Sequence, residues 1–394
     1  MGRPTLAHPW PLLLGTSTLL FVVMVMSFTP TPLYPLYQDL WGLSDSAIGL
    51  AFTAYPIGVV ITLILLGGLS DRFGRRDTLL ISAVLIGAAL VTMMFAVSYP
   101  LLLLGRFLQG VGAALAAGAG AATLMEAHPG GLFRGSLVNT LSVAGGSAVG
   151  PLMAGALADA TPFPLIIPYL VVLVMLILPF IFLVKAQDFI PRKRDASLVR
   201  PIRLPRALWP TFSIAAATVL GTNLCMGIYG SFGSNLAGTV GWVSEAYSGL
   251  LVSLVLLMLA LVQVFGRNLP PTVAMTGGLS AVAVGWASVT IASVTAATGL
   301  MVVGSMIVGA GAGLCLMGSA AQVGIISPDH RRAEIYSAYL VVAFGALGAT
   351  ALSSGPIIGL TSISVVVLVA SILSAALALY VGLGSRRWVT QKSN

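Results

Sequence analysis

Arg106 is the one basic residue of this chain that lies inside a long apolar run. The sequence holds 19 Lys and Arg residues, and the others stand at the ends of apolar runs or between them. A charged side chain deep in a bilayer costs about 2.5–3.5 kcal/mol on insertion scales, so it marks a functional site by default. Two readings stay open: a structural hydrogen-bond hub, or a functional charge.

A buried guanidinium must find hydrogen-bond acceptors. Gln109 follows Arg106 by three residues and so shares roughly the same helix face. We expect the other acceptors to be carbonyls or polar side chains of the first apolar run, such as Gln38 or residues 29–31.

A buried carboxylate is the usual carrier of a coupled proton, but no Asp or Glu stands in the middle of an apolar run. Asp39, Asp71 and Glu126 are the weak candidates for this role. No spacing of His, Cys, Asp or Glu indicates a metal site, and no nucleophile–base set or phosphate loop is present. We therefore expect neither an enzyme nor a cofactor, and no nucleic-acid partner.

The elements that position these residues are membrane helices. The chain is 58% hydrophobic and 8% charged, and no charged residue lies between Arg267 and Asp329 or between Glu334 and Arg386. Continuous apolar runs of this length predict spanning helices. The sequence predicts an all-α membrane protein with twelve spans: 11–36, 46–67, 77–97, 100–125, 136–158, 163–184, 209–231, 246–265, 273–292, 295–322, 336–356 and 362–383.

Charge distribution sets the predicted topology. With the N-terminus in the cytoplasm, every Lys and Arg except Arg106 falls on a cytoplasmic helix end or loop. This is the pattern of the positive-inside rule. We expect a multi-pass protein of the plasma (inner) membrane with both termini in the cytoplasm.

The second half of the chain repeats the first at an offset near 200. Matching pairs include Ser44-Asp45-x-x-x-Gly49 with Ser244-Glu245-x-x-x-Gly249, Gly150-Pro151 with Gly355-Pro356, and Phe73-Gly74-Arg75 with Phe265-Gly266-Arg267. Ser44 and Ser244 are each expected to cap the following helix. The pattern predicts two six-helix bundles, 1–184 and 208–394, joined by a basic cytoplasmic linker, 185–207. Parallel six-span repeats imply a central cavity and alternating access.

The loop after the second span reads Gly67-Gly68-Leu69-Ser70-Asp71-Arg72-Phe73-Gly74-Arg75-Arg76. It resembles the signature loop of the major facilitator superfamily, Gly-x-Leu-x-Asp-Arg-x-Gly-Arg-Arg. The resemblance implies a conformational latch of Gly67, Asp71, Arg72, Gly74, Arg75 and Arg76, which holds the cytoplasmic ends of the halves together in one state. The alternative is a plain turn anchored by positive charge.

Two further helices resemble the drug:proton antiporters of that superfamily. The fourth span carries Leu102-x-x-x-Arg106-x-x-Gln109-Gly110-x-Gly112, and the fifth carries Gly146-x-x-x-Gly150-Pro151-x-x-Ala154-Gly155. The resemblance links Arg106, Gln109 and Gly110 to proton coupling, and Gly146, Gly150, Pro151 and Gly155 to export. Ala154 stands where that family has glycine. The missing mid-span carboxylate is the second departure.

Aromatic and amide side chains are the candidates for substrate contact, and helix packing explains each of them equally well. They are Tyr34, Tyr37, Tyr55, Arg106, Asn139, Asn223, Tyr229 and Gln263. We expect a monomeric secondary transporter that exports small amphipathic compounds in exchange for protons. Uptake or facilitated diffusion of a small metabolite is the first alternative. A membrane ligand sensor that uses the scaffold without transport is the second.

Overall fold

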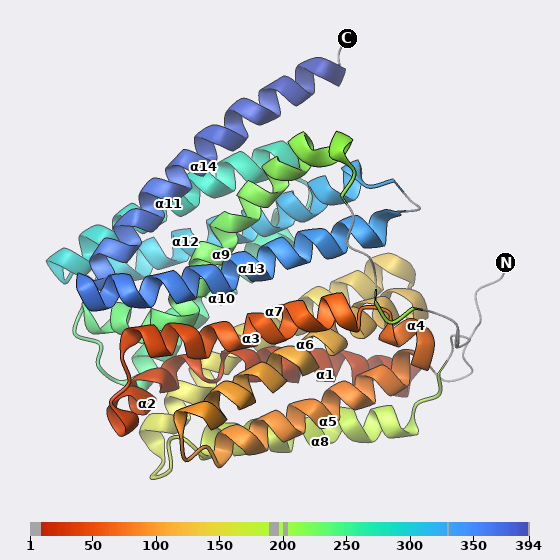
Figure 1. Ribbon diagram of the computed structural model, residues 1–394, viewed down its shortest axis with the longest axis horizontal. Helices are drawn as coiled ribbons and strands as arrows, with labels where there is room; N and C mark the ends of the chain where they lie inside the picture. Colours follow the sequence, from red (N-terminus) through yellow and green to blue (C-terminus); the bar gives the residue numbers. More distant parts are fainter. Residues whose placement is uncertain (1–8, 189–196, 200–203, 329–330, 393–394) are drawn as a thin grey trace.

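The structure is a computed structural model, and it describes residues 9–188, 197–199, 204–328 and 331–392. Within these residues, twelve helical segments are long and apolar enough to cross a membrane, as the sequence predicts. The helices run side by side, with the first half of the chain below and the second half above in Figure 1. Part of the predicted basic linker, residues 189–196 and 200–203, lies outside the described residues.

The first half contains six spanning segments and one short extra helix. Its elements are α1 (Trp10–Phe28), η1 (Thr31–Leu33), α2 (Tyr34–Trp41), α3 (Asp45–Leu65), α4 (Leu69–Phe73), α5 (Arg75–Met94), α6 (Tyr99–Ala127), α7 (Gly131–Ala160) and α8 (Ile167–Lys185). The second half follows η2 (Arg206–Leu208) with α9 (Trp209–Gly238), α10 (Glu245–Phe265), α11 (Pro271–Thr295), α12 (Thr298–Ile326), α13 (Arg332–Leu360) and α14 (Ile363–Lys392).

Two ends of the bundle need names. The linker face carries α4, the start of α1 and the start of α9, on the right of Figure 1. The far face carries α2 and the starts of α3 and α10, on the left. The halves meet along two antiparallel helix pairs, α3 with α13 and α7 with α10. We call these pairs the α3–α13 seam and the α7–α10 seam.

Close backbone contacts confirm the repeat and correct its register. A Cβ on Gly49 would collide with the Ala351 carbonyl, and one on Gly249, 200 positions on, with the Pro151 carbonyl. Gly155 meets the Glu245 carbonyl and Gly355 the Asp45 carbonyl in the same way. Gly355 is therefore the counterpart of Gly155, and the predicted match of Gly150-Pro151 with Gly355-Pro356 is wrong.

The match of Phe73-Gly74-Arg75 with Phe265-Gly266-Arg267 is wrong for a related reason. Helices α3 and α10 end at the corresponding residues Leu65 and Phe265, and α4 is an insertion present after α3. Gly74 has a positive φ of 98°, which favours glycine, whereas Gly266 has φ −83°. The turns at Gly74 and Gly266 therefore have similar sequences but different backbone conformations.

The first span is broken, contrary to the single helix expected over 11–36. Helix α1 ends at Phe28, a short 3₁₀ turn follows, and α2 continues to Trp41. Pro30 and Pro32 cannot donate the backbone hydrogen bonds that a continuous helix needs here. In the second half, α9 has non-helical angles at Phe232 (φ −128°, ψ 21°), the counterpart of Pro32. Both halves therefore bend their first span at the same level.

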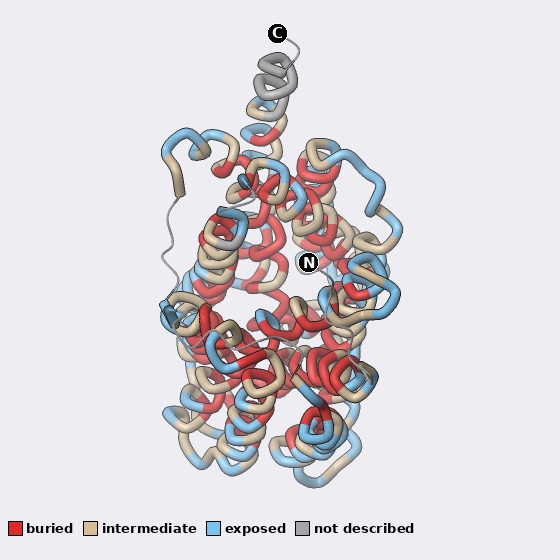
Figure 2. The backbone as a smooth tube through the Cα atoms, turned by 90° about the vertical axis from the view of Figure 1, so that its right-hand side faces the viewer, coloured by how far each residue is buried: buried red, intermediate tan, exposed pale blue. Residues whose placement is uncertain are grey.

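The seams are tight toward the far face and looser toward the linker face. All four glycine contacts above lie in the far-face parts of the seams. On α7, no residue between Gly135 and Gly146 is buried, and on α10 none after Ala260. Figure 2, which looks onto the linker face, shows buried residues along the middle and exposed ones around the rim. The described chain is thus closed at the far face.

Candidate functional site

Arg106 lies buried in the first half, on α6, with 1% of its surface exposed. Its Nη1 donates to the Gln109 Oε1 atom at 2.7 Å and to the Ser27 carbonyl at 3.1 Å. The guanidinium carbon lies 5.5 Å from the Phe52 ring centre and 5.1 Å from that of Tyr55, both on α3. Such contacts stabilise a desolvated cation. The site therefore joins α1, α3 and α6.

The acceptors come from the first span, as expected, but they are the Ser27 and Met26 carbonyls in the last turn of α1 and not residues 29–31. The terminal carbonyls of a helix lack partners within it. Pro30 has no N–H to offer the Met26 carbonyl, which accepts from Gln109 Nε2 at 3.5 Å instead. The expectation that Gln38 would serve Arg106 is wrong, because Gln38 Nε2 donates to Asp45 Oδ1 at 3.1 Å. The prolines after Met26 were the sequence signal for the freed carbonyls.

The charge of Arg106 has no neutralising carboxylate among the described residues. Its Nε atom is buried without a hydrogen-bond partner, as is the hydroxyl of Tyr34 on α2. Ser305, its counterpart by sequence, instead accepts from the Tyr229 hydroxyl at 2.7 Å, and Tyr229 stacks on Trp286 at 5.1 Å. The two halves have the same helix arrangement, but the buried charge at Arg106 has no counterpart at Ser305.

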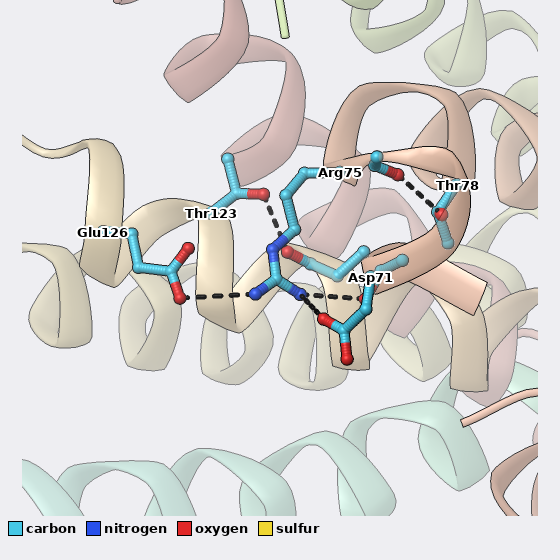
Figure 3. A network of polar contacts seen from close by, with 8 residues as sticks. Asp71, Arg75, Thr78, Thr123 and Glu126 are labelled. Atoms are coloured by element: carbon cyan, nitrogen blue, oxygen red, sulfur yellow. Dashed lines mark hydrogen bonds and ion pairs between the residues drawn. The ribbon is translucent and has the colours of Figure 1, made fainter. Parts of the chain in front are cut away.

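The signature loop forms a compact ion-pair network on the linker face (Figure 3). Arg75 lies 3.3 Å from Glu126 on α6 and 3.9 Å from Asp71 on α4, and it donates to the Ser70 hydroxyl at 2.8 Å. Arg72 lies against its neighbour Phe73, with its guanidinium carbon 5.8 Å from the ring centre. The network ties α4, α5 and α6 of the first half together, so the loop is built to hold its own shape.

Arg76 plays a different part from its neighbours. Its Nε and Nη2 atoms donate to the Leu183 and Val184 carbonyls, each at 2.9 Å. These are terminal carbonyls of α8, so Arg76 caps that helix. Its nearest carboxylate is the adjacent Asp77, at 3.2 Å.

Gly68 makes a close backbone approach in the loop. Its N–H donates to the Leu198 carbonyl at 2.9 Å, and a Cβ there would collide with the Ser197 carbonyl. Gly67 lies in the turn between α3 and α4. This contact could not be predicted from the sequence, because Leu198 lies in the linker, remote along the chain.

The glycine motif of α7 faces two helices at once. Cβ atoms on Gly146 and Gly150 would collide with carbonyls of α1, whereas Gly155 abuts α10 of the other half. Pro151 and Ala154 are buried on the same helix. The motif therefore packs α7 against α1 through Gly146 and Gly150, and its Pro151–Gly155 end lies in the α7–α10 seam.

The expected substrate-contacting residues fall into separate groups. Tyr55 lies at Arg106 and is within hydrogen-bond distance of the Ser27 hydroxyl at 3.4 Å, whereas Tyr37 bonds Tyr169 at 3.2 Å. Asn223 donates to Val219 and Gln263 to Leu259, each within its own helix. Asn139 lies on α7 in the stretch without buried residues.

Asn139 and Gln263 lie at about the same level of the α7–α10 seam. This follows from the antiparallel pairing of Pro151 with Gly249 and of Gly155 with Glu245. Asn139 stands in the stretch 136–145 of α7 and Gln263 in the stretch 261–265 of α10, and neither stretch has a buried residue. The seam is therefore the place where these two amides could meet a substrate.

The three weak proton-carrier candidates lie at helix ends. Asp39 is an exposed residue of α2, Asp71 belongs to α4, and Glu126 pairs with Arg75 near the end of α6. No group of three metal-ligating side chains occurs among the residues searched.

Twelve spanning helices in two pseudo-symmetric bundles, with seams between them, define a membrane transporter. The family model described as Major Facilitator Superfamily matches residues 16–352, and the chain belongs to that family. It is a transporter and not an enzyme.

Curated relatives match in pieces. The bacillibactin exporter of Bacillus subtilis is 32% identical over 109 residues, 26% of each chain. The multidrug resistance protein MdtL of Shewanella sp. is 38% identical over 72 residues, 18% of each chain. The 4-hydroxybenzoate transporter PcaK of Pseudomonas aeruginosa is 25% identical over 308 residues, 73% of this chain and 67% of its own. The chain thus matches about a quarter of the bacillibactin exporter and less than a fifth of MdtL.

One solved structure shows the same fold over nearly the whole chain. A bacterial homologue of the human lysosomal transporter Spinster, in an inward-facing and occupied conformation, superposes with a TM-score of 0.76 at 14% identity. The match covers 95% of this chain and 96% of that one.

Proposed function

We propose that this protein is a secondary active transporter that exports small amphipathic compounds in exchange for protons. The observation that carries the proposal is the glycine motif of α7. The motif resembles that of exporters of this superfamily, and its Pro151–Gly155 end packs against α10 of the other half. The exporter names of two relatives support the direction.

Arg106 is the proposed coupling residue. Its partners come from α1, α3 and α6, so a change in its hydrogen bonds would move three helices together. Its unpaired Nε leaves one donor for a substrate acceptor or a water molecule.

We place the linker face in the cytoplasm of a plasma membrane. The described helix ends and loops of that face carry a row of basic residues: Arg72, Arg75, Arg76, Arg134, Lys185, Arg206, Arg267, Arg331 and Arg332. The positive-inside rule supports this orientation. The two halves are proposed to be 1–184 and 208–394, joined by 185–207, and to work as one monomer.

A second candidate is uptake of a small organic acid. The match to the 4-hydroxybenzoate transporter covers 73% of this chain, and a buried cation suits a carboxylate substrate.

Flux measurements on purified protein in lipid vesicles would separate the candidates. Export by exchange predicts substrate movement driven by, and against, a proton gradient. Symport predicts movement with the gradient, and facilitated diffusion predicts flow that a gradient does not change. Absence of flux for neutral, anionic and cationic probes alike would contradict all three.

A further inference from the structure

A side chain from one half holds the end of a helix in the other half. Asp159, in the last turn of α7, accepts hydrogen bonds from the Glu245 N–H at 3.2 Å and the Ala246 N–H at 3.3 Å. It also accepts from the Ser244 hydroxyl. The first amides of α10 have no partner within their own helix, and a carboxylate there is favoured by the helix dipole. Asp159 therefore caps α10 across the α7–α10 seam.

The other seam lacks the equivalent side chain. The counterpart of Asp159 is Gly359, exposed near the end of α13, and a Cβ there would meet no atom within 4 Å. On α3 the helix caps itself, with the Ala47 N–H donating to the Ser44 hydroxyl at 3.3 Å. The expectation that Ser244 caps α10 in the same way is wrong, because its hydroxyl donates to Asp159 instead.

Both halves of this contact lie at the far face, where the seams are tight. Any movement that opens the far face must separate α7 from α10 there, because Gly155 and Gly249 pack against the opposite backbones beside Asp159. Separation would break the hydrogen bonds from the first amides of α10 to Asp159, and water would have to replace them. The free-energy cost of losing this cap arises at the α7–α10 seam and not at the α3–α13 seam, where Gly359 replaces Asp159.

We propose that Asp159 is the gate residue of the far face, and that its cap on α10 sets the balance between the closed and open states. This rests on the alternating access of the proposed function. The readout is a distance, measured without substrate or proton gradient, so it is independent of what is transported.

The experiment uses the full chain with nitroxide labels at Val97 and Leu360. These residues belong to different halves of the far face, and 82% and 86% of their surfaces are exposed. The buried Cys225 and Cys315 are replaced by alanine, and label distances are measured by pulsed electron paramagnetic resonance in lipid discs.

Asp159→Ala should raise the ratio of long to short distances about fivefold, the size expected for the loss of one helix cap. Asp159→Asn keeps a capping oxygen and should move the ratio less. Gly359→Asp should lower the ratio, since it offers α3 the cap that α10 already has. Asp39→Asn removes a far-face charge without touching the cap and should leave the ratio unraised.

Two results would overturn the proposal. One is a distance distribution that neither Asp159→Ala nor Gly359→Asp moves in its expected direction. The other is a rise with Asp39→Asn as large as that with Asp159→Ala, which would assign the effect to net charge. Both altered positions are exposed, so the folded protein should tolerate them.

Discussion

At the scale of single residues, Arg106 joins a charge to a break in the backbone. Its place in an apolar run and its link to Gln109 follow from the sequence. Its remaining acceptor does not, because a freed carbonyl depends on where α1 ends. The proline pair after Phe28 explains that end in retrospect, and the Tyr55 and Phe52 rings could not be assigned without the packing of α3 against α6.

Arg106→Lys tests whether geometry or charge matters. Lysine keeps the charge but loses the planar fork and its stacking between rings, so transport should fall about tenfold or more, nearly as far as with Arg106→Ala. Initial rates in vesicles at matched protein content provide the measurement. Full activity of the lysine variant would mean that charge alone suffices.

The signature loop separates function from stability within a few residues. Asp71→Asn should cut transport strongly but leave the thermal unfolding temperature near that of the parent, because Arg75 keeps Glu126 and Ser70. Arg76→Ala should instead lower that temperature, since two bonds to carbonyls of α8 are lost at a cost of about 1–3 kcal/mol.

Transport assays and thermal unfolding in detergent would be run on both variants. Normal transport by a well-expressed Asp71→Asn protein would remove the latch from the mechanism. An unchanged unfolding temperature for Arg76→Ala would remove the capping role.

At the scale of elements, the sequence predicts which segments form helices and misses how they bend and touch. Apolar runs bounded by charge locate all twelve spans, because the bilayer requires helices of that length. The same rule does not predict the contact of Gly68 with the linker or the hydrogen bonds of Asp159 to the start of α10. Those contacts join segments that are distant in sequence, and the composition of one segment does not indicate that it contacts the other.

Gly249→Ala should act as a wedge in the α7–α10 seam. The added methyl group collides with the Pro151 carbonyl, so the far face can close only by displacing backbone. We expect a larger share of long Val97–Leu360 label distances. Gly277→Ala on α11 is the matched control, because its methyl group meets nothing within 4 Å. Equal distance distributions for both variants would show that the α7–α10 seam accommodates the added methyl group without opening the far face.

At the scale of the whole molecule, the described spans hold one buried cation and no carboxylate to balance it. Coulomb repulsion is poorly screened away from water. We therefore predict that neutral or weakly anionic compounds are transported in preference to quaternary cations. Competition assays in vesicles with size-matched probes of each charge would measure the order. Robust export of a quaternary ammonium dye would contradict it, and would direct attention to Asp39 or Glu126.

Equivalent contacts recur in the two halves at offsets of 199 to 200, so one half can serve as the control for the other in a saturation mutagenesis screen. Tolerance profiles over residues 45–160 and 245–360 should correlate once they are aligned helix by helix, since paired glycines meet paired carbonyls. Departures should cluster where the halves differ in chemistry, at Arg106 and Asp159. Such a difference map would locate the residues that give the transporter its direction without any substrate in hand.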